Sequence, residues 1–473
     1  MAASVMMKLA LLILSITSHQ VLAAHHQHTI NVQSLLSSEM CSSAPAAPVT
    51  QASLPGAAGS TLQIVRRLCL QTGNNKTVSD HYTAILHRDH HRVRSIHRHL
   101  AGSQSTITIP ARLGLPFHSL EYVVTIGIGT PPQNFTVLFD TGSDLTWVQC
   151  APCGDSCHAQ EEPLFDPKNS NTYANIQCDA PECHIRGGGE PNSCGSGFTC
   201  AYTVQYGDNS QTFGNLAKET ITLSPLAPPA TGVVFGCSDK TTGLLRDESV
   251  AGLLGLGRGD SSILSQTRRT NDGGVVFSYC LPPRGSSAGY LVIGDDAPQP
   301  SNLTFTPLKT DNPRLSSVYA VDLSSISVNG AAVPIPASAF SEGTVIDSGT
   351  VITHMPRAAY LPLRDEFRRH MGDYTMLPEG SVGALDTCYD VTGLDVVTAP
   401  RVAFEFGGGA RMDVDASGIL YVIGALGEAV ACLAFLPMDS VGLVIIGNMQ
   451  QRAHKVVFDV AGGRVGFGPG GCS

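Results

Sequence analysis

The 473-residue sequence has few charged residues, lacks any long tract rich in Ala, Glu, Lys and Leu, and after residue 23 has no apolar run long enough to cross a membrane. Charged residues make up 14% of the chain and hydrophobic residues 42%, which permits a large core and excludes a mainly disordered protein. The missing tracts argue against a helical bundle or coiled coil. The 49 Gly and 29 Pro residues instead favour many strands joined by turns, and the length fits two or three domains, or one large domain of two lobes.

The first 23 residues have the pattern of a secretory signal peptide. Lys8 supplies the positive start, residues 9–16 the apolar stretch, and residues 21–23 a small-residue cleavage site. A membrane anchor is the weaker interpretation, because the apolar run is too short to span a bilayer. The sequence ends in Gly-Pro-Gly-Gly-Cys-Ser, without the apolar tail of a lipid-anchor signal. We therefore expect a soluble product of the secretory pathway.

Charge divides the remainder into two parts. Residues 24–116 hold 8 Lys and Arg against 3 Asp and Glu, a balance of +5, together with 9 of the 16 His residues. Residues 117–473 hold 20 Lys and Arg against 36 Asp and Glu, a net charge of −16. This asymmetry predicts a removable basic, His-rich pro-segment that lies against an acidic body. The densest basic patch, residues 87–99, can also be interpreted as a solvated helix face or a nucleic-acid patch.

Fourteen cysteines indicate a disulfide framework, given the secretory signal. Zinc binding is the weaker alternative for the Cys150-x-x-Cys153 spacing in an oxidising compartment. The sequence does not determine the connectivity, but we expect Cys280 to pair with Cys472 and Cys388 with Cys432. Two cysteines, Cys41 and Cys69, fall in the pro-segment, and the other disulfide candidates are Cys150, Cys153, Cys157, Cys178, Cys183, Cys194, Cys200 and Cys237.

Three Asn-x-Ser/Thr sequons are candidate glycosylation sites if their side chains are exposed: Asn75, Asn134 and Asn302. Asn134 lies between two strand-like runs, and we expect it at a turn.

One short motif occurs twice in the body. An apolar strand runs into Asp-Thr-Gly-Ser at Asp140 and into Asp-Ser-Gly-Thr at Asp347, 207 residues later. An apolar-apolar-Gly triplet follows each motif, ending at Gly255 in the first half and at Gly447 in the second. A lone Asp-Thr-Gly is expected by chance in about a tenth of chains of this length. Two copies at matching places predict two similar halves, each with one aspartate loop and one supporting strand.

The residue types of the repeat suit acid–base chemistry on water. Two carboxylates brought face to face share one proton, so that one acts as general base and the other as general acid. The glycines allow tight turns, and the hydroxyls satisfy carboxylate and backbone groups in a buried loop. These supporting residues are Thr141, Gly142, Ser143, Ser348, Gly349 and Thr350. No metal or cofactor is needed; the structural alternative is a plain Asp-Gly turn between strands.

The body resembles the pepsin-like (family A1) aspartic proteases, and most of all their plant, nepenthesin-like and chloroplast-nucleoid-protease-like branch. The resemblance covers residues 120–472 and is carried by the stretches 122–133, 140–150, 277–281 and 445–448. It implies a mainly β, bilobal fold: two related β-barrel-like lobes with the active-site cleft between them. The implied organisation is a signal peptide (1–23), a propeptide (24–116), an N-terminal lobe with a cysteine-rich insert (117–295) and a C-terminal lobe (296–473).

The resemblance assigns roles to particular residues. It makes Asp140 and Asp347 the catalytic dyad. It makes Tyr206, followed by Gly207, the tyrosine of a flap hairpin that closes over substrate. Trp147, the only Trp, matches the position that hydrogen-bonds this tyrosine, although simple core filling is the alternative.

Two positions depart from the family pattern. Asn209 stands where relatives often carry Gly, but Asn tolerates left-handed turns, so we expect the hairpin to survive. Ser348 stands where animal pepsins carry Thr, and the hydroxyl is kept.

Two further segments are predicted to be structural. Residues 356–372 have the periodicity of an amphipathic helix that packs on the core. Residues 255–260, which contain Arg-Gly-Asp, are expected to form a turn rather than an adhesion or phosphate site.

The sequence therefore predicts a secreted aspartic endopeptidase, made as a zymogen, that hydrolyses peptide bonds at acidic pH without a covalent intermediate. Its partners would be polypeptide substrates and its own propeptide as inhibitor. We expect a monomer without cofactor, metal, nucleic acid or membrane, in the extracellular space (apoplast) or the vacuole. The alternatives are a non-catalytic inhibitor or binding protein on the same fold, and a nucleic-acid-associated protease. The acidic body disfavours the nucleic-acid-associated protease, since its negative charge repels phosphate.

Overall fold

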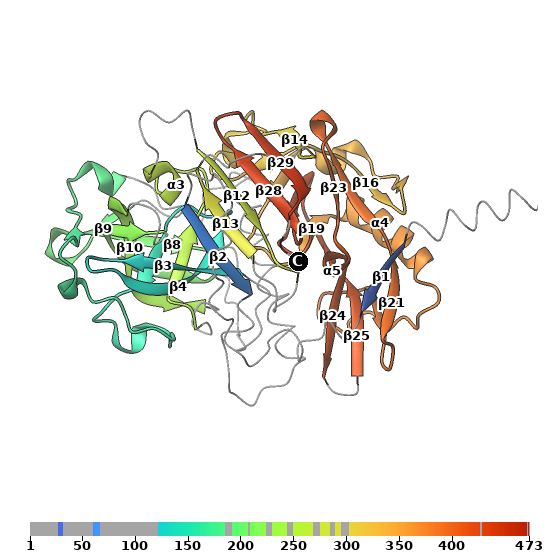
Figure 1. The fold of residues 1–473 in the computed structure, drawn as a ribbon, viewed down its shortest axis with the longest axis horizontal. Helices are drawn as coiled ribbons and strands as arrows, with labels where there is room; N and C mark the ends of the chain where they lie inside the picture. Colours follow the sequence, from blue (N-terminus) through green and yellow to red (C-terminus); the bar gives the residue numbers. More distant parts are fainter. Residues whose placement is uncertain are drawn as a thin grey trace, which may run out of the picture.

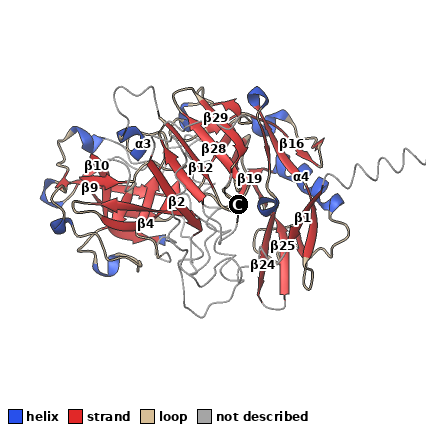
Figure 2. Cartoon of the chain, viewed as in Figure 1, coloured by secondary structure: helices blue, strands red, loops and turns tan. Residues whose placement is uncertain are grey.

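The computed structural model describes the chain at residues 27–31, 60–66, 122–184, 192–206, 209–223, 229–243, 249–267, 275–283, 289–294, 302–425, 428–470 and 472 (Figure 1). Strands dominate and helices are few and short (Figure 2). The predicted mainly β class is confirmed. No helix among the described residues is long and apolar enough to cross a membrane.

The first half of the body forms one end of a large sheet, drawn in teal and green in Figure 1. The order of its main strands is β3-β4-β11-β5-β10-β9-β8-β7, and β6 pairs with β9. Their bounds are β3 Tyr122–Ile128, β4 Gln133–Asp140, β5 Trp147–Gln149, β6 Ala174–Asn175, β7 Ser193–Cys194, β8 Cys200–Gln205, β9 Gln211–Thr222, β10 Ala230–Thr242 and β11 Gly252–Gly255; one short helix, α3, spans Ile263–Gln266.

The same sheet continues into the second half of the chain. Its far end has the order β14-β29-β28-β12-β13, and β2 (Ser60–Arg66) joins that end to β3. β2 pairs with β13 on one side and with the start of β3 on the other (Figure 1). The bounds are β12 Val276–Cys280, β13 Gly289–Ile293, β14 Thr304–Pro307, β28 His454–Asp459 and β29 Arg464–Pro469.

Within the residues that the structure describes, the second half adds three smaller sheets and a 14-residue helix. The sheets have the orders β15-β18-β27-β19-β26, β17-β16-β22-β23 and β20-β25-β24. The strands are β15 Ala320–Val321, β16 Leu323–Val328, β17 Ala331–Ala332, β18 Gly343–Ile346, β19 Thr353–Pro356, β20 Cys388–Asp390, β22 Val402–Phe406, β23 Arg411–Asp413, β24 Leu420–Ala425, β25 Glu428–Leu433, β26 Phe435–Met438 and β27 Leu443–Ile446. A separate pair joins β1 (Gln27–Asn31) to β21 (Val396–Pro400).

The predicted amphipathic helix is α4, Arg357–His370, beside the much shorter α5, Ala416–Ile419. Tyr360, Leu363 and Phe367 of α4 are buried, because their three- and four-residue spacing places them on one face. The largest core cluster draws side chains from both halves. Within it, Phe277 stacks on Phe458 with ring centroids 4.5 Å apart.

Six disulfides join the twelve cysteines of the body. Cys280 is bonded to Cys472 and Cys388 to Cys432, the two pairs that we expected. The others are Cys150–Cys237, Cys153–Cys157, Cys178–Cys194 and Cys183–Cys200. Cys150 and Cys153 therefore belong to different disulfides, and neither sulfur is a thiolate available to zinc. Cys41 and Cys69 lie outside the described residues.

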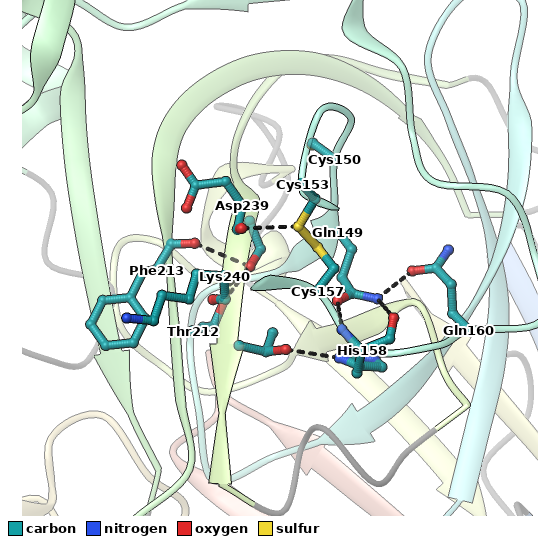
Figure 3. Close-up of a disulfide and its surroundings, with 12 residues drawn as sticks. Gln149, Cys150, Cys153, Cys157, His158, Gln160, Thr212, Phe213, Asp239 and Lys240 are labelled. Carbon is teal, nitrogen blue, oxygen red and sulfur yellow. Dashed lines mark hydrogen bonds between the residues drawn. A yellow bond between two sulfur atoms is a disulfide. The ribbon is translucent and has the colours of Figure 1, made fainter. Parts of the chain in front are cut away.

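The cysteine-rich stretch is held by side-chain bonds as well as by disulfides (Figure 3). Gln149 at the end of β5 accepts from the backbone N–H of His158 at 2.8 Å and donates to the His158 carbonyl at 3.0 Å. Next to this pair, the sulfur of Cys153 lies 2.9 Å from the carbonyl oxygen of Asp239 on β10. The loop that carries Cys153–Cys157 is thus fixed against the N-terminal part of the large sheet.

We had expected Asn134 at a turn, but the structure places it in a strand. It is the second residue of β4 and lies opposite Gly127 of β3. The turn closes earlier, at residues 129–132, because Gly129 has a positive φ of 96° and the following Pro131 and Pro132 have no N–H for a strand ladder.

Candidate active site between the two halves

The two aspartates occupy equivalent places in the fold. Asp140 is the last residue of β4, which lies parallel to β11 so that Asp140 faces Gly255. Asp347 directly follows β18, which lies parallel to β27. Each apolar-apolar-Gly triplet of the sequence is therefore the strand that supports one aspartate loop. Both carboxylates are almost completely buried, at 1% and 0% relative exposure.

Reciprocal hydrogen bonds join the two aspartate loops. The backbone N–H of Thr141 donates to Ser348 Oγ at 3.0 Å, and the N–H of Ser348 donates to Thr141 Oγ1 at 2.9 Å. Each hydroxyl also donates to the strand before the opposite aspartate: Thr141 Oγ1 to Ile346 O at 3.1 Å, and Ser348 Oγ to Phe139 O at 3.2 Å. All four bonds are buried, where a hydrogen bond is electrostatically stronger than in water, so they hold the two loops against each other.

Each carboxylate is fixed within its own loop by the same two donor types. One oxygen accepts from the backbone N–H two residues on, and the other accepts from a hydroxyl three residues on. The donors are Gly142 N (2.9 Å) and Ser143 Oγ (2.5 Å) for Asp140, and Gly349 N (3.0 Å) and Thr350 Oγ1 (2.6 Å) for Asp347. All six predicted supporting residues are thus in the loops. Such bonds to the charged form oppose the cost of burying it.

Tyr279 and Gln451 lie behind the loops, and sequence reasoning gave them no role. Gln451 Nε2 donates to the Asp347 carbonyl at 3.1 Å, and its Oε1 accepts from the Tyr279 hydroxyl. The Tyr279 ring meets Phe139, next to Asp140, edge to face at 5.0 Å. Burial, and then the charge of Asp347, raise the pKa of Tyr279 well above its ordinary value. Tyr279 belongs to the family-like stretch 277–281, whereas Gln451 had no sequence signal.

Asp144 is a third buried carboxylate beside the pair. It is 5% exposed, and its Oδ1 accepts from the Gly259 backbone N–H at 2.8 Å. Burial is the main cause that raises the pKa of Asp144 to about 6, and the charges of Asp140 and Asp260 raise it further against the lowering effect of the Gly259 bond. Its position in the motif Asp-Thr-Gly-Ser-Asp, four residues after Asp140, could have indicated a third carboxylate at the site, but we did not use it.

The predicted flap is the hairpin of β8 and β9, with Tyr206 directly after β8. Tyr206 N–H donates to Ser210 O at 2.8 Å, and Asn209 N–H donates to Tyr206 O at 3.0 Å. Asn209 has a φ of 63°, the left-handed conformation that we expected Asn to tolerate. Trp147 is fully buried and its Nε1 donates to the Tyr206 hydroxyl at 2.6 Å, so it both fills the core and holds the tyrosine. Gly207 lies outside the described residues.

The remaining predicted sites are the three candidate glycosylation sites. Asn134 and Asn302 are exposed, and Asn75 is outside the described residues. Across the described part of the chain, no three His, Cys, Asp or Glu side chains are grouped so that they could hold a metal ion.

Comparison with known proteins identifies the family. Family models described as xylanase inhibitor N-terminal and xylanase inhibitor C-terminal match residues 122–295 and 318–469. An aspartyl protease family protein of Arabidopsis thaliana is 42% identical over 463 residues, which cover 94% of this chain and 93% of that protein. Aspartic proteinase nepenthesin-2 of Nepenthes gracilis is 32% identical over 414 residues, 85% of this chain and 88% of that protein.

Solved structures agree on the fold. The crystal structure of edgp has a TM-score of 0.57 at 23% identity, over 74% of this chain and 91% of that one. Basic 7S globulin from soybean has a TM-score of 0.54 at 22% identity, over 73% and 91%. At this identity they support the bilobal fold alone. Together with the sequence relatives and the paired aspartate loops, they show that the chain belongs to the plant branch of the pepsin-like aspartic-type endopeptidases.

Proposed function

We propose that the protein is an aspartic endopeptidase in which Asp140 and Asp347 form the catalytic dyad and cleave polypeptides at acidic pH. The observation that carries this proposal is the reciprocal set of hydrogen bonds between the two loops. It brings two buried carboxylates, with matching donors, to the same junction. One chain supplies both loops, so the site needs no second subunit, and we propose a monomer.

The chemistry follows from the shared environment of the two carboxylates. Two buried acids at one junction ionise one at a time, so a single proton is shared between them. The ionised acid removes a proton from a bound water, which attacks the peptide carbonyl, while the protonated acid donates to the developing oxyanion. The carboxyl proton then passes to the leaving nitrogen as the C–N bond breaks. The loop N–H and hydroxyl donors keep both acids in orientation throughout.

Tyr206 would lie in the flap that closes over substrate, and Trp147 would hold Tyr206 in place. A flap excludes water and strengthens the electrostatic interactions beneath it. The 2.6 Å bond from Trp147 anchors the Tyr206 hydroxyl to the rigid strand β5, which limits the positions open to the flap tyrosine.

We further propose that residues 24–116 act as an inhibitory propeptide of a secreted zymogen. Two strands of this segment support the idea. β2 pairs with all five residues of β13 and with the first two of β3, and β1 pairs with β21 in the second half. The opposite charges of segment and body add long-range attraction. Secretion to the extracellular space or the vacuole is supported by the signal sequence and the disulfides.

A non-catalytic inhibitor or binding protein is the second candidate, because the matching family models carry the description xylanase inhibitor. The intact aspartates and their four hydroxyl neighbours argue against it, since a binder has no need of two buried carboxylates with matched donors.

The test is cleavage of a denatured protein by the purified full chain, shifted from neutral to acid pH. Processing of residues 24–116 is followed by mass spectrometry in the same samples. Wild type and Asp395→Asn, which removes an exposed carboxylate of the second half, should cleave. Asp140→Asn, Asp347→Asn and wild type with a statine-type inhibitor should not. Absence of cleavage by wild type after the segment has gone would refute the proposal and favour the binding protein.

A further inference from the structure

Asp144 lies in a cradle formed by the residues after β11, which we call the glycine turn (256–260). Gly259 donates its N–H to Asp144 Oδ1 at 2.8 Å. A Cβ added to Gly257 would lie 2.2 Å from Asp144 Oδ1, and one added to Gly259 would lie 2.3 Å from Oδ2. While Asp144 keeps this position, only glycine fits at either place, so the turn and the carboxyl group are shaped to each other.

The glycine turn connects the first aspartate loop to the second half of the chain. Leu256 N–H donates to the Asp140 carbonyl at 2.8 Å, and Gly257 N–H donates to the Ser143 carbonyl at 2.8 Å. On the other side, Arg258 N–H donates to the Ser317 carbonyl at 2.9 Å. The same turn therefore bonds to both halves.

The connection continues to the second aspartate through Tyr319. The Tyr319 hydroxyl donates to Leu256 O at 2.8 Å, and the Tyr319 carbonyl accepts from Ile346 N–H at 3.0 Å. Ile346 directly precedes Asp347. A continuous path of bonded groups thus runs from the Asp144 carboxyl to the strand that presents the second aspartate.

The charges around Asp144 make this path sensitive to ionisation. The titratable or charged groups near it are Asp140 in its own loop, Arg258 and Asp260 in the turn, and Tyr319 from the second half. The dyad already carries one negative charge when active. An ionised Asp144 adds a second in the same buried region, where repulsion between like charges is strong.

We propose that Asp144 is a positioning residue for the dyad. While Asp144 holds its proton, it keeps the glycine turn bonded to both aspartate loops, and when Asp144 ionises this connection loosens. The inference rests on the proposed function of Asp140 and Asp347. The repulsion is relieved when Asp144 leaves the cradle and releases the glycine turn. The aspartate loops then lose this connection between the two halves, so the ionisation of Asp144 contributes to the upper pH limit of catalysis.

The test is the pH profile of kcat/KM for a peptide substrate, measured with acid-processed full chain from about pH 3 to about pH 8. Wild type should fall on the alkaline side with a limiting logarithmic slope of about two, because both the dyad and Asp144 must keep a proton. Asp144→Asn keeps an acceptor for Gly259 N–H but cannot ionise, and its slope should be about one. Asp260→Asn, which removes the exposed neighbouring carboxylate, should keep a slope of about two.

Equal slopes in wild type and Asp144→Asn would overturn the inference while the proposed function stands. A wild type without activity at any pH would instead overturn the proposed function. In that case thermal unfolding still tests the cradle: Tm should fall more between pH 5 and about pH 8 in wild type than in Asp144→Asn. Equal falls in Tm would refute the role of Asp144.

Discussion

Ser348→Ala tests whether the hydrogen bonds between the aspartate loops hold the site together. The Ser348 hydroxyl accepts from Thr141 N–H at 3.0 Å and donates to Phe139 O at 3.2 Å. Its loss leaves both buried backbone groups without that partner. Each buried group left unsatisfied costs about 1–3 kcal/mol, so the loss of the two bonds should lower the free energy of unfolding by about 2–6 kcal/mol. The displaced loops should also lower kcat by about tenfold or more, because small misplacements of catalytic groups are costly.

Urea unfolding measures the first effect in an Asp140→Asn background, where self-digestion is avoided, and peptide cleavage measures the second in the active enzyme. The matched control is Ser348→Thr, which keeps the hydroxyl and reproduces the residue at the equivalent position, Thr141. We expect it to cost less than Ser348→Ala, because both hydrogen bonds of the hydroxyl are kept. A Ser348→Ala protein within about 0.5 kcal/mol of its parent, with unchanged kcat, would refute the reasoning.

Three further predictions follow from single contacts. The pKa of Asp144 is raised from 3.8 to about 6, so the folded state binds this proton more tightly than the unfolded state does. The resulting contribution to the free energy of unfolding is complete below about pH 4 and falls by about 3 kcal/mol as the pH rises through 6. Urea unfolding of wild type and Asp144→Asn at several pH values should show this difference. An equal pH dependence in the two proteins would contradict it. Tyr206→Phe removes the acceptor of the 2.6 Å bond from Trp147, and should lower kcat/KM by roughly tenfold, a loss of about 1.4 kcal/mol; unchanged kinetics would exclude a role for this bond. Tyr279→Phe leaves the Gln451 oxygen without its buried donor and should lower the free energy of unfolding by about 1–3 kcal/mol, whereas no change would show that the bond is not stabilising.

The features that could be predicted from the sequence were those with a local or repeated sequence pattern. The two aspartate loops were found because each is a short apolar strand that ends in the same kind of turn, and the second copy removed the ambiguity of the first. The helix α4 was found because the spacing of Tyr360, Leu363 and Phe367 is set by the helix itself. Such features depend on neighbouring residues and need no knowledge of the rest of the fold.

Several contacts between distant residues were missed. Asp144 and Gly259 are 115 residues apart, and Tyr279 and Gln451 are 172 apart. Nothing within either segment indicates its partner, because a buried carboxyl and a glycine turn are each common alone. Most disulfides stayed open for a different reason, because candidate cysteines close together in the sequence allow many pairings: Cys150 bonds to Cys237 across 87 residues, while Cys153 bonds to Cys157 across 4.

The reciprocal bonds between the aspartate loops also limit how the two halves of the chain can evolve. Thr141 satisfies groups of the second loop and Ser348 satisfies groups of the first, so a substitution at either position exposes a defect in the other half. Selection therefore acts on the pair, and one half cannot drift freely here even after its surface, cysteines and substrate contacts have diverged from those of its twin. In this sequence the supporting strands differ between the halves, Leu253-Leu254-Gly255 against Ile445-Ile446-Gly447, while both loops carry the bridging hydroxyl. The two halves should therefore stay most alike at the positions where each completes the hydrogen bonding of the other.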